Sequence, residues 1–313
     1  MSDNPPITVG VVAGEADYAA VEWATYEAAV RGAPLLIVTV IEDLEPTMRA
    51  WRLPAEYVHD VARTAQGVVT EASVVARVIA NQAGVRDLEI GGKVIRGATR
   101  DKLIAQSSDA AMMVFGARSK HGLRPDPIAS ALAMHARCPV VLVPTTRSTE
   151  TPAHRIVVGV DGSPASAEAV AAAFDEADRR DAPLLAVHSW KENKVHSAFG
   201  DPDDSRLIDL QEAENALIAE QLAGWRQDYP DVDVTYRSMH GDPADVLAQV
   251  SREAELLVVG SRGLGGFTGM LLGSTSQQLM HDPPCPTLIA RHRERGGQTL
   301  FHRFTRAVPA TRP

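Results

Sequence analysis

The chain has 313 residues and a formal net charge of −9, and 45% of its residues are hydrophobic. These values predict a folded globular protein long enough for two domains, and the acidic balance argues against a nucleic-acid-binding surface. No stretch approaches the roughly 20 apolar residues that span a bilayer, and the first residues lack the regions of a signal peptide, so we expect a soluble cytoplasmic protein with no membrane contact.

The chain repeats itself, and the repeat defines two halves. Residues 9–11, Val-Gly-Val, return as residues 158–160, and the same shift of 149 positions places Ala-Pro-Leu-Leu at 33–36 on the identical residues 182–185. Further along, the shift falls to 144, which gives the second half a shorter middle segment. Two homologous domains follow.

The repeat and the composition predict the domain boundaries. We expect an N-terminal domain at residues 1–145 and a C-terminal domain at 153–292, joined by a polar, turn-rich linker at 146–152. Basic residues dominate from Arg291 to Pro313 without a regular apolar period. We expect a mobile basic extension there, with residues 293–313 outside both domains.

Strands and helices alternate within each half, which is typical of a parallel sheet covered on both faces. Ser163 followed by Pro164 predicts the start of an alanine-rich helix that runs to Arg180. Another long helix is expected to end near Pro230. The strands expected in the second half are Arg155–Val160, Leu184–Ser189, Val232–Ser238, Leu256–Gly260 and Thr287–Ala290.

Cysteine and histidine give little sign of metal or redox chemistry. Cys138 and Cys285 each precede a proline that opens an apolar run, so we expect small core residues at the starts of strands. His135 and His281 fall near the ends of equivalent helices and are expected there as surface residues. We predict no catalytic residue and no protein metal site.

A spaced set of glycines predicts an anion site. Gly260-Ser261-Arg262-Gly263 directly follows an apolar strand, and Gly273-Ser274 comes nine residues later, at the expected start of a helix. Glycines allow close approach of the backbone, and the N–H groups at a helix N-terminus attract an anion. A tight turn is the more common meaning of such glycines taken alone.

Asp161-Gly162-Ser163 follows the first strand of the second half, where it could be an Asx turn before a helix or part of the same site. Together with the glycine spacing, the Gly241-Asp242-Pro243 turn and the Cys-Pro pairs, it resembles the universal stress protein family. The resemblance covers nearly the whole chain. It implies two tandem doubly wound α/β domains, each with a five-stranded parallel sheet in the order 3-2-1-4-5 and helices on both faces, in which the first and fourth strands are neighbours.

The resemblance also implies ATP as the ligand, together with Mg²⁺. The glycine loop and the N–H groups of Ser274 and Thr275 would hold the phosphates, Asp161 would accept from ribose or help hold magnesium, and the backbone near Val187 would meet adenine. The side chain of Arg262 either contacts a phosphate or is a solvated loop side chain, and the sequence leaves both alternatives open. The implied binding residues are Asp161, Gly162, Ser163, Val187, Gly260, Arg262, Gly263, Gly273, Ser274 and Thr275.

The N-terminal half departs from this pattern. Val12 stands where Asp161 stands, and Ser119 replaces Gly263. Either Ala129-Ser130 or Asp126-Pro127 occupies the Gly-Ser position, and neither alignment restores the glycine. A carboxylate would repel phosphate and proline lacks an N–H donor, so we expect one nucleotide per chain, in the C-terminal half.

No phosphate-loop or nucleophile-elbow motif indicates an enzyme. The sequence favours an ATP-binding protein with a regulatory or stress-adaptation role and at most slow hydrolysis. The alternatives are a nucleotide-independent interaction scaffold and a nucleotidyl transferase or ATP pyrophosphatase. The resemblance further implies that Val140–Val143 pairs with Thr287–Ala290, and we expect a homodimer of whole chains and an unidentified protein partner.

Overall fold

The computed structural model describes residues 4–12, 18–43, 55–117, 127–144, 153–190, 204–263 and 272–291. The elements of the N-terminal half are β1 (Ile7–Gly10), α1 (Tyr18–Arg31), β2 (Leu35–Ile41), α3 (Ala55–Gln82), β3 (Ile90–Arg96), α4 (Thr99–Gln106), β4 (Met112–Ala117), α5 (Pro127–His135) and β5 (Val140–Pro144). Those of the C-terminal half are β6 (Ala153–Gly159), α6 (Pro164–Arg180), β7 (Leu184–Trp190), α7 (Asp204–Asp228), β8 (Val234–His240), α8 (Pro243–Ser251), β9 (Ala254–Gly260), α9 (Ser274–His281) and β10 (Thr287–Ala290).

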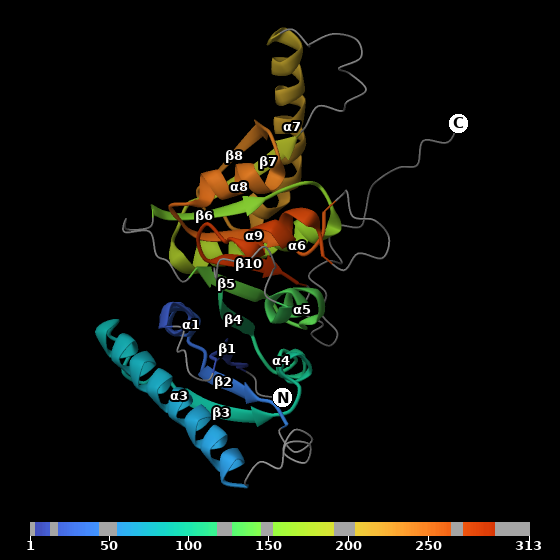
Figure 1. Cartoon of the computed structure of the whole chain (residues 1–313). Coiled ribbons are helices and arrows are strands. Elements are labelled where there is room, and N and C mark those ends of the chain that lie inside the picture. Colours follow the sequence, from blue (N-terminus) through green and yellow to red (C-terminus); the bar gives the residue numbers. More distant parts are fainter. Residues whose placement is uncertain are drawn as a thin grey trace.

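The described strands form one ten-stranded sheet in the order β3-β2-β1-β4-β5-β10-β9-β6-β7-β8, which runs through the whole molecule (Figure 1). Each half therefore has the order 3-2-1-4-5, and its own strands are parallel. The predicted pair of doubly wound α/β units is confirmed. The expected linker at 146–152 lies outside the described residues.

The expected strands of the C-terminal half agree with the structure to within two residues at each end, and Thr287–Ala290 agrees fully. The predicted start of α6 is also confirmed, because the Ser163 side chain accepts a hydrogen bond from the Ser166 N–H at 3.1 Å. Asp242 caps α8 in the same way, ahead of Pro243. Short polar caps of this kind are local, so the sequence alone reveals them.

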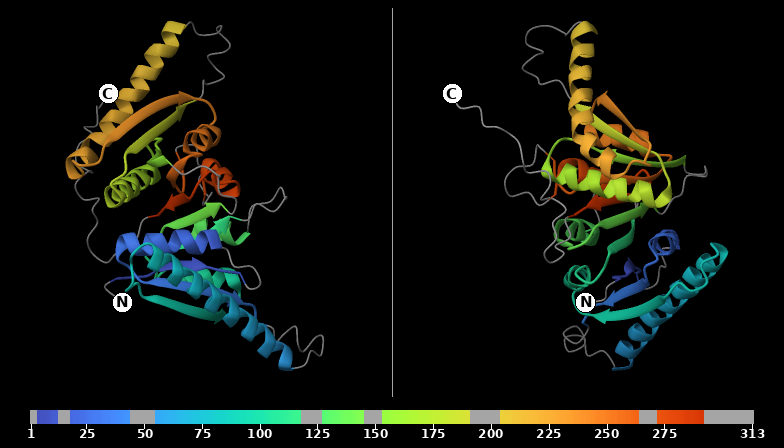
Figure 2. Two further views of the ribbon diagram at one scale, coloured as in Figure 1. Left: turned by 90° about the vertical axis from the view of Figure 1, so that its left-hand side faces the viewer. Right: turned by 180° about the vertical axis from the view of Figure 1, so that it is seen from behind.

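Helices cover both faces of the sheet (Figure 2). One apolar core lies under α1, α3, α6 and α7 and includes residues of both halves, such as Val9, Ile156 and Phe174. On the opposite face, α4 packs with α5 and α8 packs with α9. Within the described ranges, no helix is both long and apolar enough to cross a membrane.

The two halves join through antiparallel pairing of β5 with β10, as predicted. Leu288 lies opposite Val141, and these two residues are counterparts in the repeat, 147 positions apart. Thr287 faces Leu142 and Ile289 faces Val140, which is the reciprocal arrangement expected around a two-fold axis. The tandem chain therefore builds an isologous interface from its own repeats.

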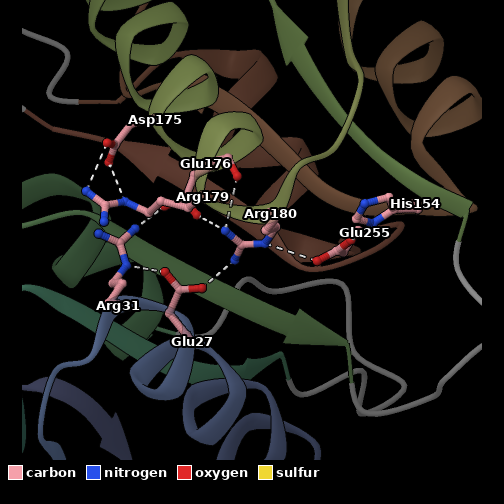
Figure 3. Close-up of polar contacts among 8 residues, drawn as sticks. All are labelled: Glu27, Arg31, His154, Asp175, Glu176, Arg179, Arg180 and Glu255. Atoms are coloured by element: carbon pink, nitrogen blue, oxygen red, sulfur yellow. Dashed lines mark hydrogen bonds and ion pairs between the residues drawn. The ribbon is translucent and has the colours of Figure 1, made fainter. Parts of the chain in front are cut away.

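Next to this junction, α1 and α6 meet through a reciprocal set of ion pairs (Figure 3). Glu27 contacts Arg180 and Arg31 contacts Glu176, while each carboxylate also pairs with the arginine four residues later on its own helix. Glu176 and Glu27 are counterparts, as are Arg180 and Arg31, all with the shift of 149. The side chains of the two glutamates are at most 2% exposed.

Burial shifts the pKa values of the residues in these ion pairs. It raises the pKa of Glu176 from 4.5 to about 7, helped by the neighbouring Glu27 charge and opposed by Arg180 and Arg31. Burial lowers the pKa of Arg180, but the charges of Glu27 and Glu176 outweigh this effect and raise it overall. Arg180 therefore stays cationic, and Glu176 titrates near neutral pH.

Removing one cation from the buried group should destabilise the fold. In Arg180→Met, Glu27 and Glu176 share only Arg31, and we expect a loss of about 3 kcal/mol in the free energy of unfolding, the scale for breaking a buried ion pair. The matched control is Arg179→Met, which loses a half-exposed pair with Asp175 and should cost less than about 1 kcal/mol. Urea unfolding measures both; equal losses would contradict the importance of the buried group.

The raised pKa of Glu176 predicts the sign of a pH dependence. The folded state holds this proton more tightly than the unfolded chain, so its stabilising contribution is complete below about pH 4.5 and is lost as the pH rises to about 7. The bond to Glu255 raises the pKa of His154 above its usual 6.5. The contribution of His154 to the free energy of unfolding is therefore also lost with rising pH, from about pH 6.5 upward. The test compares urea midpoints of wild type and Glu176→Gln from pH 4.5 to 8: the variant should show the shallower decline, and parallel curves would refute the assignment.

Candidate functional site

The two predicted motifs meet at the carboxyl edge of the sheet. β6 and β9 are parallel neighbours, so the segments that follow them leave the sheet side by side. A β-carbon on Gly263 would stand 2.4 Å from Asp161 Oδ2. Gly263 therefore lies directly against the carboxylate that follows β6, and a larger residue there would displace the Asp161 side chain.

Asp161 is held by its own turn. Its Oδ1 accepts a hydrogen bond from the Ser163 N–H at 3.0 Å, and its N–H donates to Ser166 Oγ at 3.1 Å. Gly162 adopts a φ of +81°, which suits glycine at this turn. The Asx turn considered from sequence is thus present, and it leaves Oδ2 directed at the Gly263 loop.

Close backbone approach also explains Gly260. A β-carbon there would lie 2.6 Å from the Ala165 carbonyl oxygen, in the first turn of α6. The Gly260 carbonyl accepts a hydrogen bond from Ser276 Oγ at 2.6 Å, and the Gly273 N–H donates to the Ser261 carbonyl at 2.9 Å. These bonds fix the start of α9 beside the end of β9.

The N-terminus of α9 offers backbone donors at this edge. Gly273 is the N-cap, and no hydrogen bond to a capping side chain occurs there among the described residues. The N–H groups of the first turn have no intrahelical partners, and the helix dipole makes them attractive to an anion. Ser274 is exposed and Thr275 is half-buried, while Arg262 is exposed close by. These groups are the donors on which the predicted anion site depends.

Val187 lies deeper than the sequence suggested. Val187 lies within β7, which continues to Trp190, and it is 1% exposed. Its carbonyl accepts a hydrogen bond from the Val160 N–H at 2.9 Å. Contact of this backbone with a ligand stays a prediction.

The N-terminal half lacks the matching arrangement in its described part. Val12 is 48% exposed and carries no carboxylate. α5 begins at Pro127 as α9 begins at Ser274, so the alignment that counts back from Cys138 is the correct one, and Ala129-Ser130 lie inside the helix. Ser119 and Asp126 lie outside the described residues.

Several residues of the site were not found from sequence. Ser166 and Ser276 are buried and hold the two turns, and Gln221 of α7 approaches the Gly162 turn, 3.0 Å from where a β-carbon would stand. His188 Nδ1 lies 2.7 Å from the Val160 carbonyl, which only accepts, so Nδ1 carries the proton. Serine inside a helix gives no sequence signal, and α7 and β7 reach this turn only through the tertiary fold.

Metal and thiol chemistry gain no support from the described ranges. They contain no group of three or more His, Cys, Asp or Glu able to hold a metal ion. Both cysteines are buried and free, and burial raises the pKa of Cys285 to about 12. The cysteines are core residues ahead of the fifth strands, and His135 and His281 end α5 and α9, as expected.

Comparison with known proteins identifies the family. The model of the universal stress protein family matches residues 4–144 and again 152–291. The chain belongs to the universal stress protein family. Universal stress protein Rv1996 of Mycobacterium tuberculosis is 34% identical over 311 residues, covering 92% of this chain and 95% of the relative.

Two further comparisons agree. Universal stress protein Rv2005c of Mycobacterium tuberculosis is 35% identical over 290 residues, covering 91% of this chain and 96% of the relative. The crystal structure of a universal stress protein from Archaeoglobus fulgidus aligns with a TM-score of 0.62 at 16% identity, covering 91% of this chain and 96% of that one. This structural likeness shows that the fold is shared over both halves.

The tight packing at Gly260 predicts a stability effect. Gly260→Ala should destabilise the protein by about 1–3 kcal/mol, because its methyl group would overlap backbone that cannot move without shifting α6. Gly67→Ala in α3 is the control: nothing lies within 4 Å of the new methyl group, and helix propensity should stabilise by roughly 0.5–1 kcal/mol. Opposite signs in urea unfolding are expected; a neutral Gly260→Ala would contradict the close approach.

Proposed function

We propose that this universal stress protein binds ATP in its C-terminal half and acts in regulation or stress adaptation through nucleotide occupancy. The observation that carries the proposal is the meeting of Asp161 with Gly263 beside the N-terminus of α9. A carboxylate suits sugar hydroxyls, and glycine-lined backbone donors suit phosphates. The two parts of a nucleotide thus find complementary chemistry at one edge of the sheet.

The residues present fit a triphosphate. Gly273 and Gly263 let the segments around the site pack closely, because a β-carbon on Gly273 would lie 3.3 Å from Arg262 Cα. The N–H groups of Ser274 and Thr275 supply donors, and Arg262 adds a cation. Magnesium prefers phosphate oxygens and one or two carboxylates, so the Asp161 carboxylate is the protein group that would contribute to it.

The N-terminal half is proposed to bind no ATP. Val12 cannot replace the carboxylate of Asp161, and α5 begins with Pro127, which has no N–H to donate. This half instead completes the sheet and the buried interface. A binding role fits the sequence better than rapid turnover, because the motifs of phosphate-loop and elbow enzymes are missing from it.

Titration of nucleotide-stripped protein with ATP and magnesium should show one site per chain. Asp161→Ala should weaken binding about five- to a hundredfold, the cost of losing a partner for a buried polar group. Val12→Ala, at the counterpart position, should leave the affinity unchanged. Calorimetry gives the number of sites per chain and the affinity. Two sites would refute the division between the halves, and no binding would favour the interaction scaffold. Rapid phosphate release in a separate hydrolysis assay would favour an enzyme.

A further inference from the structure

Arg291 connects the C-terminal half to α5 of the N-terminal half. Its Nε donates to the Ala133 carbonyl at 2.8 Å, and its Nη1 donates to the Ala136 carbonyl at 3.3 Å. Carbonyls at a helix C-terminus lack intrahelical partners and carry the negative end of the dipole. Arg291 thus caps a helix of the other half, and it lies within the range 153–292 expected for the C-terminal domain.

The same residue lies beside the candidate cradle. β10 is parallel to β9 with Ala290 opposite Gly260, so Arg291 and the Ser261-Arg262 segment emerge from the sheet next to each other. The pKa of Arg291 is lowered, first by burial and then by the positive charge of Arg262, while Glu168 of α6 acts in the opposite direction. Two guanidinium groups are therefore close enough to repel.

The contact made by Arg291 has no equivalent at the corresponding position of the N-terminal half. The counterpart of Arg291 is Pro144, at the same shift of 147 that relates Cys285 to Cys138. Proline has no side-chain donor, so it cannot cap α9 as Arg291 caps α5. Among the described residues, this contact is made by the half that carries Asp161 and has no counterpart at Pro144.

We propose that nucleotide occupancy of the C-terminal cradle strengthens the contact of Arg291 with α5. A triphosphate against Arg262 and the N-terminus of α9 neutralises the charge that opposes Arg291, so its bonds to the α5 carbonyls tighten. This inference rests on the proposed ATP site. Because coupling is reciprocal, the contact with α5 in turn favours the bound nucleotide. The N-terminal half then senses a ligand that it does not bind.

Hydrogen exchange on the full, nucleotide-stripped chain tests the coupling. Magnesium-ATP should slow exchange in the last turn of α5, including the Ala136 N–H that bonds to the Leu132 carbonyl, by about two- to fivefold. In Arg291→Met, ATP should bind about two- to fivefold more weakly, and saturating ATP should leave α5 exchange unchanged. The control is Arg137→Met, which removes an exposed arginine at the same helix end and should keep the wild-type response.

Each result separates the coupling from the ATP site. Binding of ATP without a change at α5 overturns the coupling alone, as does a full response in Arg291→Met. Faster exchange at α5 would mean that Arg291 leaves the helix for the phosphates, which also overturns it. Absence of ATP binding in the wild type overturns the coupling together with the proposed function.

Discussion

The antiparallel pairing of β5 with β10 is the interaction on which the rest of the structure depends. An edge strand exposes unpaired backbone groups, and here two such edges cover each other within one chain. Because Leu288 pairs with its own counterpart Val141, the pairing imposes an approximate two-fold relation on everything around it. It brings α1 against α6 on one face and α5 against α9 on the other.

A two-fold relation brings equivalent side chains together, and equivalent charged side chains repel each other. Glu27 and Glu176 would repel if they were alone at this contact. An arginine four residues after each glutamate solves this, because each acid then meets both its own helix's arginine and the other's. The repeat thus makes one E-x3-R pattern sufficient for four reciprocal charges, and Glu255 adds a further ion pair to Arg180 at 3.0 Å.

The two halves share a symmetric arrangement of strands and helices, but they differ in the residues at the carboxyl ends of the strands. Where the C-terminal half has Asp161, His188 and Arg291, the N-terminal half has Val12, Thr39 and Pro144. His188 bonds to the Val160 carbonyl, whereas the buried hydroxyl of Thr39 has no hydrogen-bond partner among the described residues. At these three positions the first half has side chains without a carboxylate, an imidazole or a guanidinium, while its strands and helices complete the sheet.

Features that repeat or act locally were predictable from sequence. The shift of 149 revealed two halves, apolar runs marked the strands, and Ser163-Pro164 marked a helix start. The glycine spacing brought together residues that the fold does place in contact, Asp161 with Gly263. The burial of Val187 was not predictable in this way, since it depends on the neighbouring elements of the fold.

Contacts between the halves were not predictable in the same way. Arg31 and Glu176 are separated by 145 residues and Arg291 and Ala133 by 158, so no local pattern joins them. Arg291 has the same charge as several residues that follow it, and nothing in its sequence context indicates that it caps a helix of the other half. The shift that relates Glu27 to Glu176 was visible in the sequence, but its meaning depends on α1 facing α6.

The buried ion pairs also disfavour other registers of the junction between the halves. β5 and β10 are short and apolar, and a slip of two residues would keep every side chain on its own face. Such a slip moves one half by about 6.6 Å along the strands, at roughly 3.3 Å per residue. Glu27 would then lose Arg180 and Arg31 would lose Glu176, which leaves buried charges uncompensated at a cost of several kcal/mol. The apolar strands β5 and β10 hold the halves together, and the buried ion pairs between α1 and α6 favour the register in which Arg291 reaches α5.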